Sequence, residues 1–144
     1  MIKLLASSSI VDNALAYARA HQLAPLTVAV LDPRGCTIVL KAEDGSSLLR
    51  AEIAQGKAWG ALGMGVGTRS LASRAEKLPV FFGSLSMLSG GRVVPVPGGV
   101  LIRSPEGEVI GACGASGDTA DNDEACVVAA IESAKLIADP GKAQ

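Results

Sequence analysis

The amino-acid sequence predicts an α/β protein of the α+β type, in which helices flank a central antiparallel sheet of about five strands. Two observations carry this prediction. Short apolar runs rich in valine and isoleucine occur in pairs joined by tight turns, at 26–41 and at 93–112. Helical patterns lie before, between and after these pairs, which favours antiparallel hairpins over a doubly wound parallel sheet.

The composition indicates a single domain over residues 1–144, without a linker or an internal repeat. Apolar residues make up 49% of the chain and charged residues 19%, the balance of a globular protein rather than a disordered one. The 13 basic and 14 acidic residues give a net charge of −1 and form no basic run. We therefore expect no nucleic-acid-binding and no membrane-binding surface.

The cysteines and the N-terminal segment bear on the cellular compartment. Cys36, Cys113 and Cys126 are odd in number and widely spaced, which argues against a disulfide framework and a zinc site. Polar residues, among them Asp12, interrupt the N-terminal apolar stretch, so it predicts an amphipathic helix rather than a signal peptide. No run reaches the ~18 apolar residues of a membrane span, and we predict a cytoplasmic protein.

The first third of the chain predicts a helix followed by a hairpin. Apolar residues at helical spacing place the helix between the Ser7–Ser9 run, which would cap it, and the Gln22–Pro25 segment, which would end it. The strand Leu26–Leu31 then turns through an Asp-Pro-Arg-Gly sequence into the strand Cys36–Lys41.

Two or three helices are expected in the middle of the chain. A cap at the end of the 43–47 loop would start the helix from Leu48 to about Gly63. After a glycine-rich break, Thr68 would cap a shorter helix that ends at Lys77. Residues 78–91 contain a proline near their start and a Gly-Gly pair at their end, which predicts a short helix and a loop.

The last third predicts a second hairpin and a helix. Its strands would be Val93–Ile102, with a Pro-Gly-Gly kink, and Val109–Ala112. The final helix would be capped by Thr119 or Asp121 and would run to about Ala138, where an Asp-Pro-Gly sequence stops it.

Two glycine patterns only partly match phosphate-binding loops. The Gly63–Gly67 pattern follows a helix and lacks the lysine of a P-loop, so a flexible break between helices is the preferred interpretation. The Gly111–Gly117 pattern lies between a strand and a helix, but acidic residues crowd that helix start and would repel a phosphate. Nucleotide binding is therefore not the preferred function.

Several charged residues are functional candidates, each with a simpler alternative. Lys57 is the one charge on the small-residue face of its helix, and it either extends to solvent or meets a ligand anion at a pocket rim. His21, the only histidine, suits the surface near a helix end, yet it is also the only histidine available as a haem or metal ligand. Asp123 and Glu124 suit a helix start, with acid–base catalysis as the alternative.

Several segments together resemble the GlcG/HbpS-type haem-binding domain, which also occurs at the C-terminus of PduO-type proteins. In chain order the matching segments are LTVAVLDPRGCTIVL, Leu48–Ala58 with Lys57, Thr68-Arg69, VPVPGGVLI and GEVIGACGASGDTADNDEACVVAAI. The resemblance covers roughly residues 10–138. Its most specific parts are the Pro-Gly-Gly loop, the glycine-rich strand end and the Asp-Glu helix start.

The resemblance implies a profilin-like sandwich and a homo-oligomer between a dimer and an octamer. It also implies a ligand pocket for haem or another tetrapyrrole, in an accessory protein of a catabolic operon. By motif, that pocket would be surrounded by Lys57, Arg69, Pro97, Gly98, Gly99, Ser116, Gly117, Asp123 and Glu124. Arg92 is a further candidate cation for an anionic ligand. The usual Ser-Gly-Gly pattern reads Ser-Gly-Asp here, which adds a charge at Asp118.

Three functions remain open on the sequence alone. A binding protein would hold haem with His21 as its only histidine and with few apolar neighbours, such as Phe81 and Met87. An enzyme, namely a lyase, isomerase or hydrolase, would act on a small carboxylated metabolite. Lys57 or Arg69 would then bind the carboxylate, while Asp123 or Glu124 moves a proton. In a purely structural protein, the glycine-rich surfaces would be subunit contacts.

Overall fold

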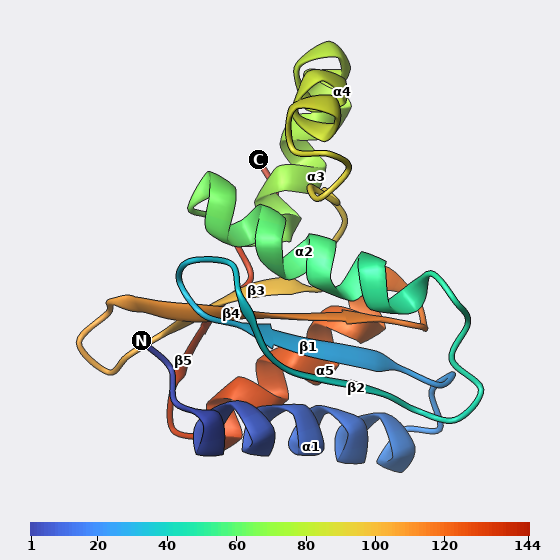
Figure 1. Ribbon diagram of the computed structural model, residues 1–144, viewed down its shortest axis with the longest axis vertical. Helices are drawn as coiled ribbons and strands as arrows, with labels where there is room; N and C mark the ends of the chain where they lie inside the picture. The colour runs from blue at the N-terminus through green and yellow to red at the C-terminus, as the bar shows by residue number, and fades with distance from the viewer.

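The computed structural model describes residues 1–144, and it places five helices around one five-stranded sheet (Figure 1). In chain order the elements are α1 (Leu4–Ala20), β1 (Thr27–Leu31), β2 (Thr37–Ala42), α2 (Arg50–Met64), α3 (Thr68–Lys77), α4 (Pro79–Leu88), β3 (Gly99–Arg103), β4 (Val109–Ser116), α5 (Ala120–Ser133) and β5 (Ile137–Asp139). The strand order is β2-β1-β4-β3-β5, and every neighbouring pair is antiparallel. The predicted fold class is therefore confirmed.

The sheet separates two hydrophobic layers of unequal size. Helices α1 and α5 pack on one face, and α2 covers the other (Figure 1). Since side chains alternate along a strand, Val28 and Val30 face α1 and α5, whereas Ala29 and Leu31 face α2. The α2 layer consists mostly of alanines from the helix and the strands. Small side chains on both sides bring this helix close to the sheet.

Two glycines set the distance between α2 and the sheet. A methyl group built on Gly114 of β4 would lie 2.0 Å from the carbonyl oxygen of Ala54. One built on Gly99 of β3 would lie 2.3 Å from the carbonyl oxygen of Lys57. Both oxygens belong to the helix backbone, which cannot move aside without disturbing the helix. The helix therefore rests directly on strand backbone at these two points.

The 92–98 segment crosses the outer side of α2. Val94 N donates to the carbonyl oxygen of Gly56 at 3.3 Å, and a methyl group on Gly56 would lie 2.6 Å from Val94 Cγ2. The helix is thus enclosed between the sheet and this segment. The prediction of a strand over Val93–Ile102 is wrong for its first part, because β3 begins only at Gly99 and Val93 and Val94 pack on α2 instead of pairing with β4.

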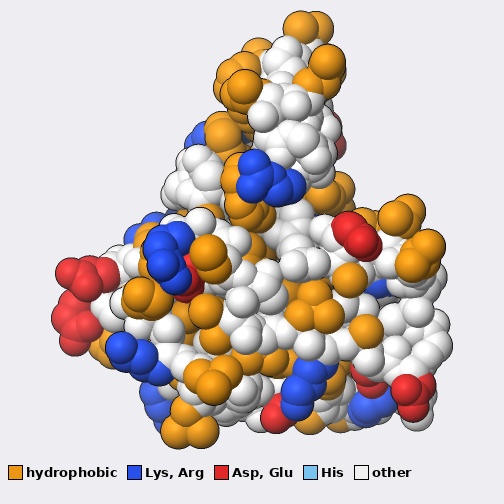
Figure 2. Space-filling view, in the orientation of Figure 1, with side chains coloured by type: hydrophobic (Ala, Val, Ile, Leu, Met, Phe, Trp, Pro, Cys, Tyr) orange, Lys and Arg blue, Asp and Glu red, His pale blue; other side chains and the backbone are white.

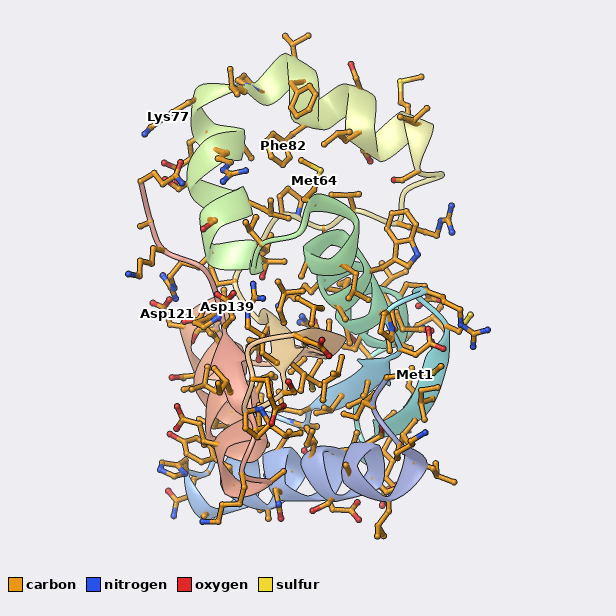
Figure 3. All side chains as sticks on the ribbon, turned by 90° about the vertical axis from the view of Figure 1, so that its left-hand side faces the viewer. Met1, Met64, Lys77, Phe82, Asp121 and Asp139 are labelled. Carbon is orange, nitrogen blue, oxygen red and sulfur yellow. The ribbon has the colours of Figure 1, made fainter.

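Helices α3 and α4 project away from the sheet, as Figures 1 and 3 show. Among the helices and strands, α4 contacts only α3. Phe82 is its one buried residue and lies on the inner side of α4, above Met64 of α2 (Figure 3). Apolar side chains gather on the projecting part in Figure 2, and the exposed ones of α4 are Val80, Phe81, Met87 and Leu88. The short helix and Gly-Gly loop predicted for 78–91 are confirmed.

Several predicted helix caps are wrong. Helix α1 begins at Leu4, before the Ser7–Ser9 run, and the Ser7 hydroxyl donates to the carbonyl oxygen of Lys3. Helix α2 has no side-chain cap from the preceding loop. Thr68 is the first residue of α3 and not its cap. Its hydroxyl instead accepts from Gly99 N at 2.8 Å and donates to Gly99 O at 3.1 Å, so it fixes the start of β3.

The predicted end of the last helix is also wrong. Thr119 caps α5, with Asn122 N donating to its hydroxyl oxygen at 3.2 Å, but the helix stops at Ser133. Lys135 has a φ of +62°, a left-handed conformation that ends a helix. The following residues form β5, which pairs with β3. Strand β4 also continues four residues past its predicted end at Ala112, to Ser116. None of the helices is both long and apolar enough to cross a lipid bilayer.

We predict that Gly114→Ala destabilises the protein by at least about 2 kcal/mol, the range of overpacked cores, because the added methyl group meets the α2 backbone. Denaturant unfolding followed by circular dichroism measures this change. Gly63→Ala is the matched control, since its added methyl group would lie 3.6 Å from Trp59 in ordinary contact. It should change stability by less than about 1 kcal/mol, toward greater stability. Equal effects of the two substitutions would contradict the close-contact explanation.

Candidate functional site

Most of the predicted site residues meet where α2, the end of β4 and the start of α5 come together. Lys57 reaches from α2 to this junction, and its Nζ donates to the carbonyl oxygen of Ala115 at 2.9 Å. The same Nζ forms an ion pair with Asp123 Oδ2 at 3.1 Å. Both side chains are almost fully buried, with 3% and 2% of their surface exposed. The alternative in which Lys57 extends to solvent is therefore wrong.

The Lys57–Asp123 pair is part of a small buried network. The other carboxylate oxygen of Asp123 accepts from Asp118 N at 3.0 Å, so both oxygens have partners. Burial lowers the pKa of Lys57, and the charge of Asp123 acts in the opposite direction. Removing two charges from water costs free energy, which close geometry and these extra hydrogen bonds offset. The pair joins α2 to α5 at the end of β4, the central strand of the sheet.

The small residues of the predicted pocket allow close packing at this junction, so they do not surround an open cavity. A methyl group on Gly98 would lie 3.0 Å from Lys57 Nζ, and the φ of Gly98 is +120°. A methyl group on Gly117 would lie 2.1 Å from the carbonyl oxygen of Pro25. Ser116 accepts a hydrogen bond from Arg50 at 3.0 Å. Of these residues, Gly98 packs against the lysine itself, Ser116 and Gly117 hold neighbouring parts of the chain, and Pro97 is half-buried.

Arg69 forms a second, more exposed group of charges beside the first. Its Nε donates to Glu124 at 2.9 and 3.0 Å, and its Nη2 pairs with Asp121. Burial raises the pKa of Glu124, and the hydrogen bond from Arg69 partly opposes this effect. Both predicted anion-binding cations, Lys57 and Arg69, therefore already have carboxylate partners within the chain.

His21 lies apart from these groups. It is exposed at the end of α1, on the opposite side of the sheet from α2 (Figure 1). Its ring stacks on Tyr17, with ring centroids 3.8 Å apart, and its Nδ1 lies 2.8 Å from the carbonyl oxygen of Tyr17. This contact leaves Nε2 free, but no other predicted site residue is near it.

Arg92 is also separate, because it belongs to a cavity that the sequence did not reveal. This cavity has a volume of about 300 Å³ and lies between α2, the β1–β2 turn and the loop after α4. The guanidinium carbon of Arg92 lies 4.2 Å from the ring centre of Trp59. We call this space the Trp59 cavity; it is lined by Leu31, Gly35, Thr37, Glu52, Gln55, Gly56, Trp59, Gly90, Gly91 and Arg92. In the sequence, the Gly90-Gly91 pair beside Arg92 was the one indication of this cavity.

A shallower, apolar depression lies on the surface of α4, and we call it the α4 depression. It measures about 530 Å³ and is lined by Phe81, Ser84, Leu85, Met87 and Leu88. Two of these residues, Phe81 and Met87, are the apolar haem neighbours suggested by the sequence. The sequence did not predict that they line one surface, because it did not show which residues of α4 face the same way.

The chain's side chains form no metal-binding cluster, and two of its three cysteines are inaccessible. No three His, Cys, Asp or Glu side chains come together so that they could hold a metal ion. Cys113 and Cys126 are buried, and burial raises the pKa of Cys126 to about 12. A thiol with so high a pKa does not act as a nucleophile at neutral pH. Both cysteines pack as small apolar residues.

We predict that Asp123→Asn destabilises the protein by about 3 kcal/mol or more, because Lys57 is left buried without a countercharge. Thermal and denaturant unfolding measure the loss. Asp121→Asn is the matched control in the same helical turn, and as an exposed residue it should cost less than about 1 kcal/mol. The double substitution Lys57→Met with Asp123→Leu should recover part of the loss. An Asp123→Asn variant as stable as the parent would contradict the buried-pair interpretation.

Comparison with known proteins assigns this chain to a family. The model of the family described as haem degrading protein HbpS-like matches residues 2–132. Klebsiella pneumoniae protein ORFY is 25% identical over 93% of this chain and 90% of that one, with a TM-score of 0.84. The PduOC protein in its haem complex is 25% identical over 99% of both chains, with a TM-score of 0.84.

HbpS is 23% identical over 92% of this chain and 89% of that one, with a TM-score of 0.78, a likeness that supports the fold. No curated protein sequence matches this chain. The family match covers almost the whole sequence and agrees with the resemblance found from the motifs. The chain therefore belongs to the HbpS-like haem-degrading protein family.

Proposed function

We propose that this protein is a homo-oligomeric binding protein for haem or another planar tetrapyrrole, which it holds on the α4 depression. The observation that carries the proposal is an apolar surface that nothing within the chain covers. Four of the five residues that line the depression are apolar, and α4 contains no charged residue. Family membership and the similar PduOC protein, whose structure is a haem complex, support the same ligand class.

The residues of the α4 depression fit a tetrapyrrole in two respects. Phe81, Leu85 and Leu88 offer apolar contact to the faces of a planar ring. Met87 adds a thioether, which is one of the side chains that bind haem iron in proteins. When bound, the haem would supply a redox-active iron, while these residues would hold the ring and exclude water from it.

A second copy of the chain would complete such a site. One copy supplies only one wall, because α4 projects beyond the sheet and its outer side faces solvent (Figure 1). Val80, Met87 and Leu88 are each more than 80% exposed, which is unusual for large apolar side chains that stay in water. An uncharged apolar helix matches another surface of the same kind, and a second α4 is such a surface. We therefore propose a dimer or a larger homo-oligomer.

Acid–base catalysis on a small carboxylated metabolite has less support. Lys57 and Arg69 would have to release Asp123 and Glu124 before they could bind a substrate carboxylate. The lowered pKa of Lys57 suits a catalytic lysine, but its Nζ is almost fully buried. We propose that the two ion pairs hold α5 in place, one against α2 and the other against α3. The three free cysteines suit a reducing compartment, which supports the proposed cytoplasmic location.

We predict that adding haem to the purified protein produces a saturable Soret band. Met87→Leu should change the band positions and weaken binding at least tenfold, because it keeps the apolar volume and removes the sulfur. Absorption titration measures both effects. Met64→Leu is the matched control, since Met64 lies outside the depression. A spectrum altered by His21→Ala and unchanged by Met87→Leu would overturn the assignment to α4.

We also predict that the mass in solution is at least twice the 14.5 kDa of one chain. Leu88→Asp should lower it to that of one chain, because a carboxylate placed in an apolar contact between subunits is costly to bury. Light scattering and sedimentation measure the mass. Leu5→Asp is the control, since Leu5 of α1 is 84% exposed and Leu88 is 85% exposed. A parent protein of 14.5 kDa at high concentration would refute the oligomer.

A further inference from the structure

The Trp59 cavity carries a second inference, which does not depend on the α4 depression. Its walls come from three parts of the chain: α2, the β1–β2 hairpin and the loop at 90–92. Its volume of about 300 Å³ is at the lower end of the range for small-molecule sites. Neither the Lys57–Asp123 pair nor the Arg69–Glu124 pair contributes a residue to it.

Arg92 presents unused hydrogen-bond donors to this cavity. Its Nε donates to the carbonyl oxygen of Ser89 at 2.7 Å, and its guanidinium stacks over Trp59. These two contacts fix the plane of the group, and no carboxylate of the chain pairs with it. The Nη groups are therefore free for a carboxylate, which a guanidinium binds through two parallel hydrogen bonds.

Glu52 provides the opposite charge on the same cavity. It lines the space with Arg92, yet the two form no ion pair and Glu52 has no other cationic partner. The helix dipole favours an acid in the first turn of α2. The dipole does not explain, however, why this carboxylate has no cation partner on the same cavity where the Arg92 guanidinium has no carboxylate partner. Two unpaired and opposite charges on one small cavity suit a ligand that carries both.

The remaining walls keep the cavity open. A methyl group on Gly35 would lie 2.7 Å from Trp59 Nε1, so only glycine allows the indole to take this position. Gly90 and Gly91 have φ values of +66° and +81°, and neither places a side chain in the space. Gln55 is held by Thr37 at 2.9 Å and by the carbonyl oxygen of Ala51 at 3.0 Å, so the wall beside Glu52 is fixed.

From this arrangement we propose that the Trp59 cavity binds a small zwitterionic amino carboxylate. The ligand carboxylate lies on the Nη groups of Arg92, its ammonium group lies on Glu52, and its methylene groups pack against the Trp59 ring. A free amino acid or an ω-amino acid of a few carbons has this chemistry and a suitable size. Binding is non-covalent, and no reaction of the ligand is part of the proposal.

The experiment uses the only tryptophan in the chain, Trp59, as the reporter. Glycine, β-alanine, γ-aminobutyrate and lysine are titrated into the full-length protein, and tryptophan fluorescence and calorimetric heat are recorded. Propionate and propylamine are titrated separately, since each carries only one of the two charges. At least one zwitterion should give a saturable change, and neither singly charged probe should match its affinity.

Variants test the assigned roles. Arg92→Met and Glu52→Gln should each weaken binding of the best zwitterion at least tenfold, while Glu76→Gln, an exposed acid of α3, should leave it unchanged. Each variant's circular dichroism and thermal midpoint show whether it folds. No saturable change up to tens of millimolar, equal binding of propionate, or unchanged affinity in both cavity variants would each overturn the proposal. Haem binding is measured separately by the Soret band, so failure of one proposal leaves the other in place.

Discussion

The close contact between α2 and the sheet is the constraint on which the rest of the structure depends. Gly114 and Gly99 let the helix backbone rest on two strands, and the alanine layer between them fills the remaining space. Because the helix lies so low, Lys57 can reach past β4 to Asp123 at the start of α5. On the outer side of the helix, the absence of a side chain at Gly56 leaves room for the 92–98 segment to cross over it.

This packing explains why the conspicuous charged motif is not an open pocket. Charges gathered at a strand end often mark an active site, but here each cation already meets an acid from α5. The surfaces that are still available to a ligand lie elsewhere, on the projecting α4 and in the Trp59 cavity. Both places lack the partners that the buried charges have: α4 has no neighbour but α3, and Arg92 has no carboxylate.

Local signals predicted the parts of the fold that local chemistry determines. The Asp-Pro-Arg-Gly turn set the first hairpin, and Thr119 capped α5 as a threonine at a helix start commonly does. The strand β5 was missed because three residues reveal no period and depend on pairing with β3. The Lys57–Asp123 pair spans 66 residues, and only the approach of α2 to β4 brings it together. The cavity at Arg92 was missed for the same reason: its partner Trp59 lies on another element.

The two outer surfaces share one short loop. Helix α4 ends at Leu88, and Ser89, the residue that follows, holds the Arg92 side chain through its carbonyl oxygen. A partner packed on α4 would fix the position of this carbonyl group. A ligand bound to Arg92 would affect the same carbonyl group through its hydrogen bond with the arginine. If either event changes the loop, the two binding free energies are coupled, and linkage requires the effect to be equal in both directions. The loop backbone itself connects the two surfaces, since Gly90 N donates to the carbonyl oxygen of Met87 at 3.1 Å and Gly91 N donates to that of Ser86 at 2.6 Å.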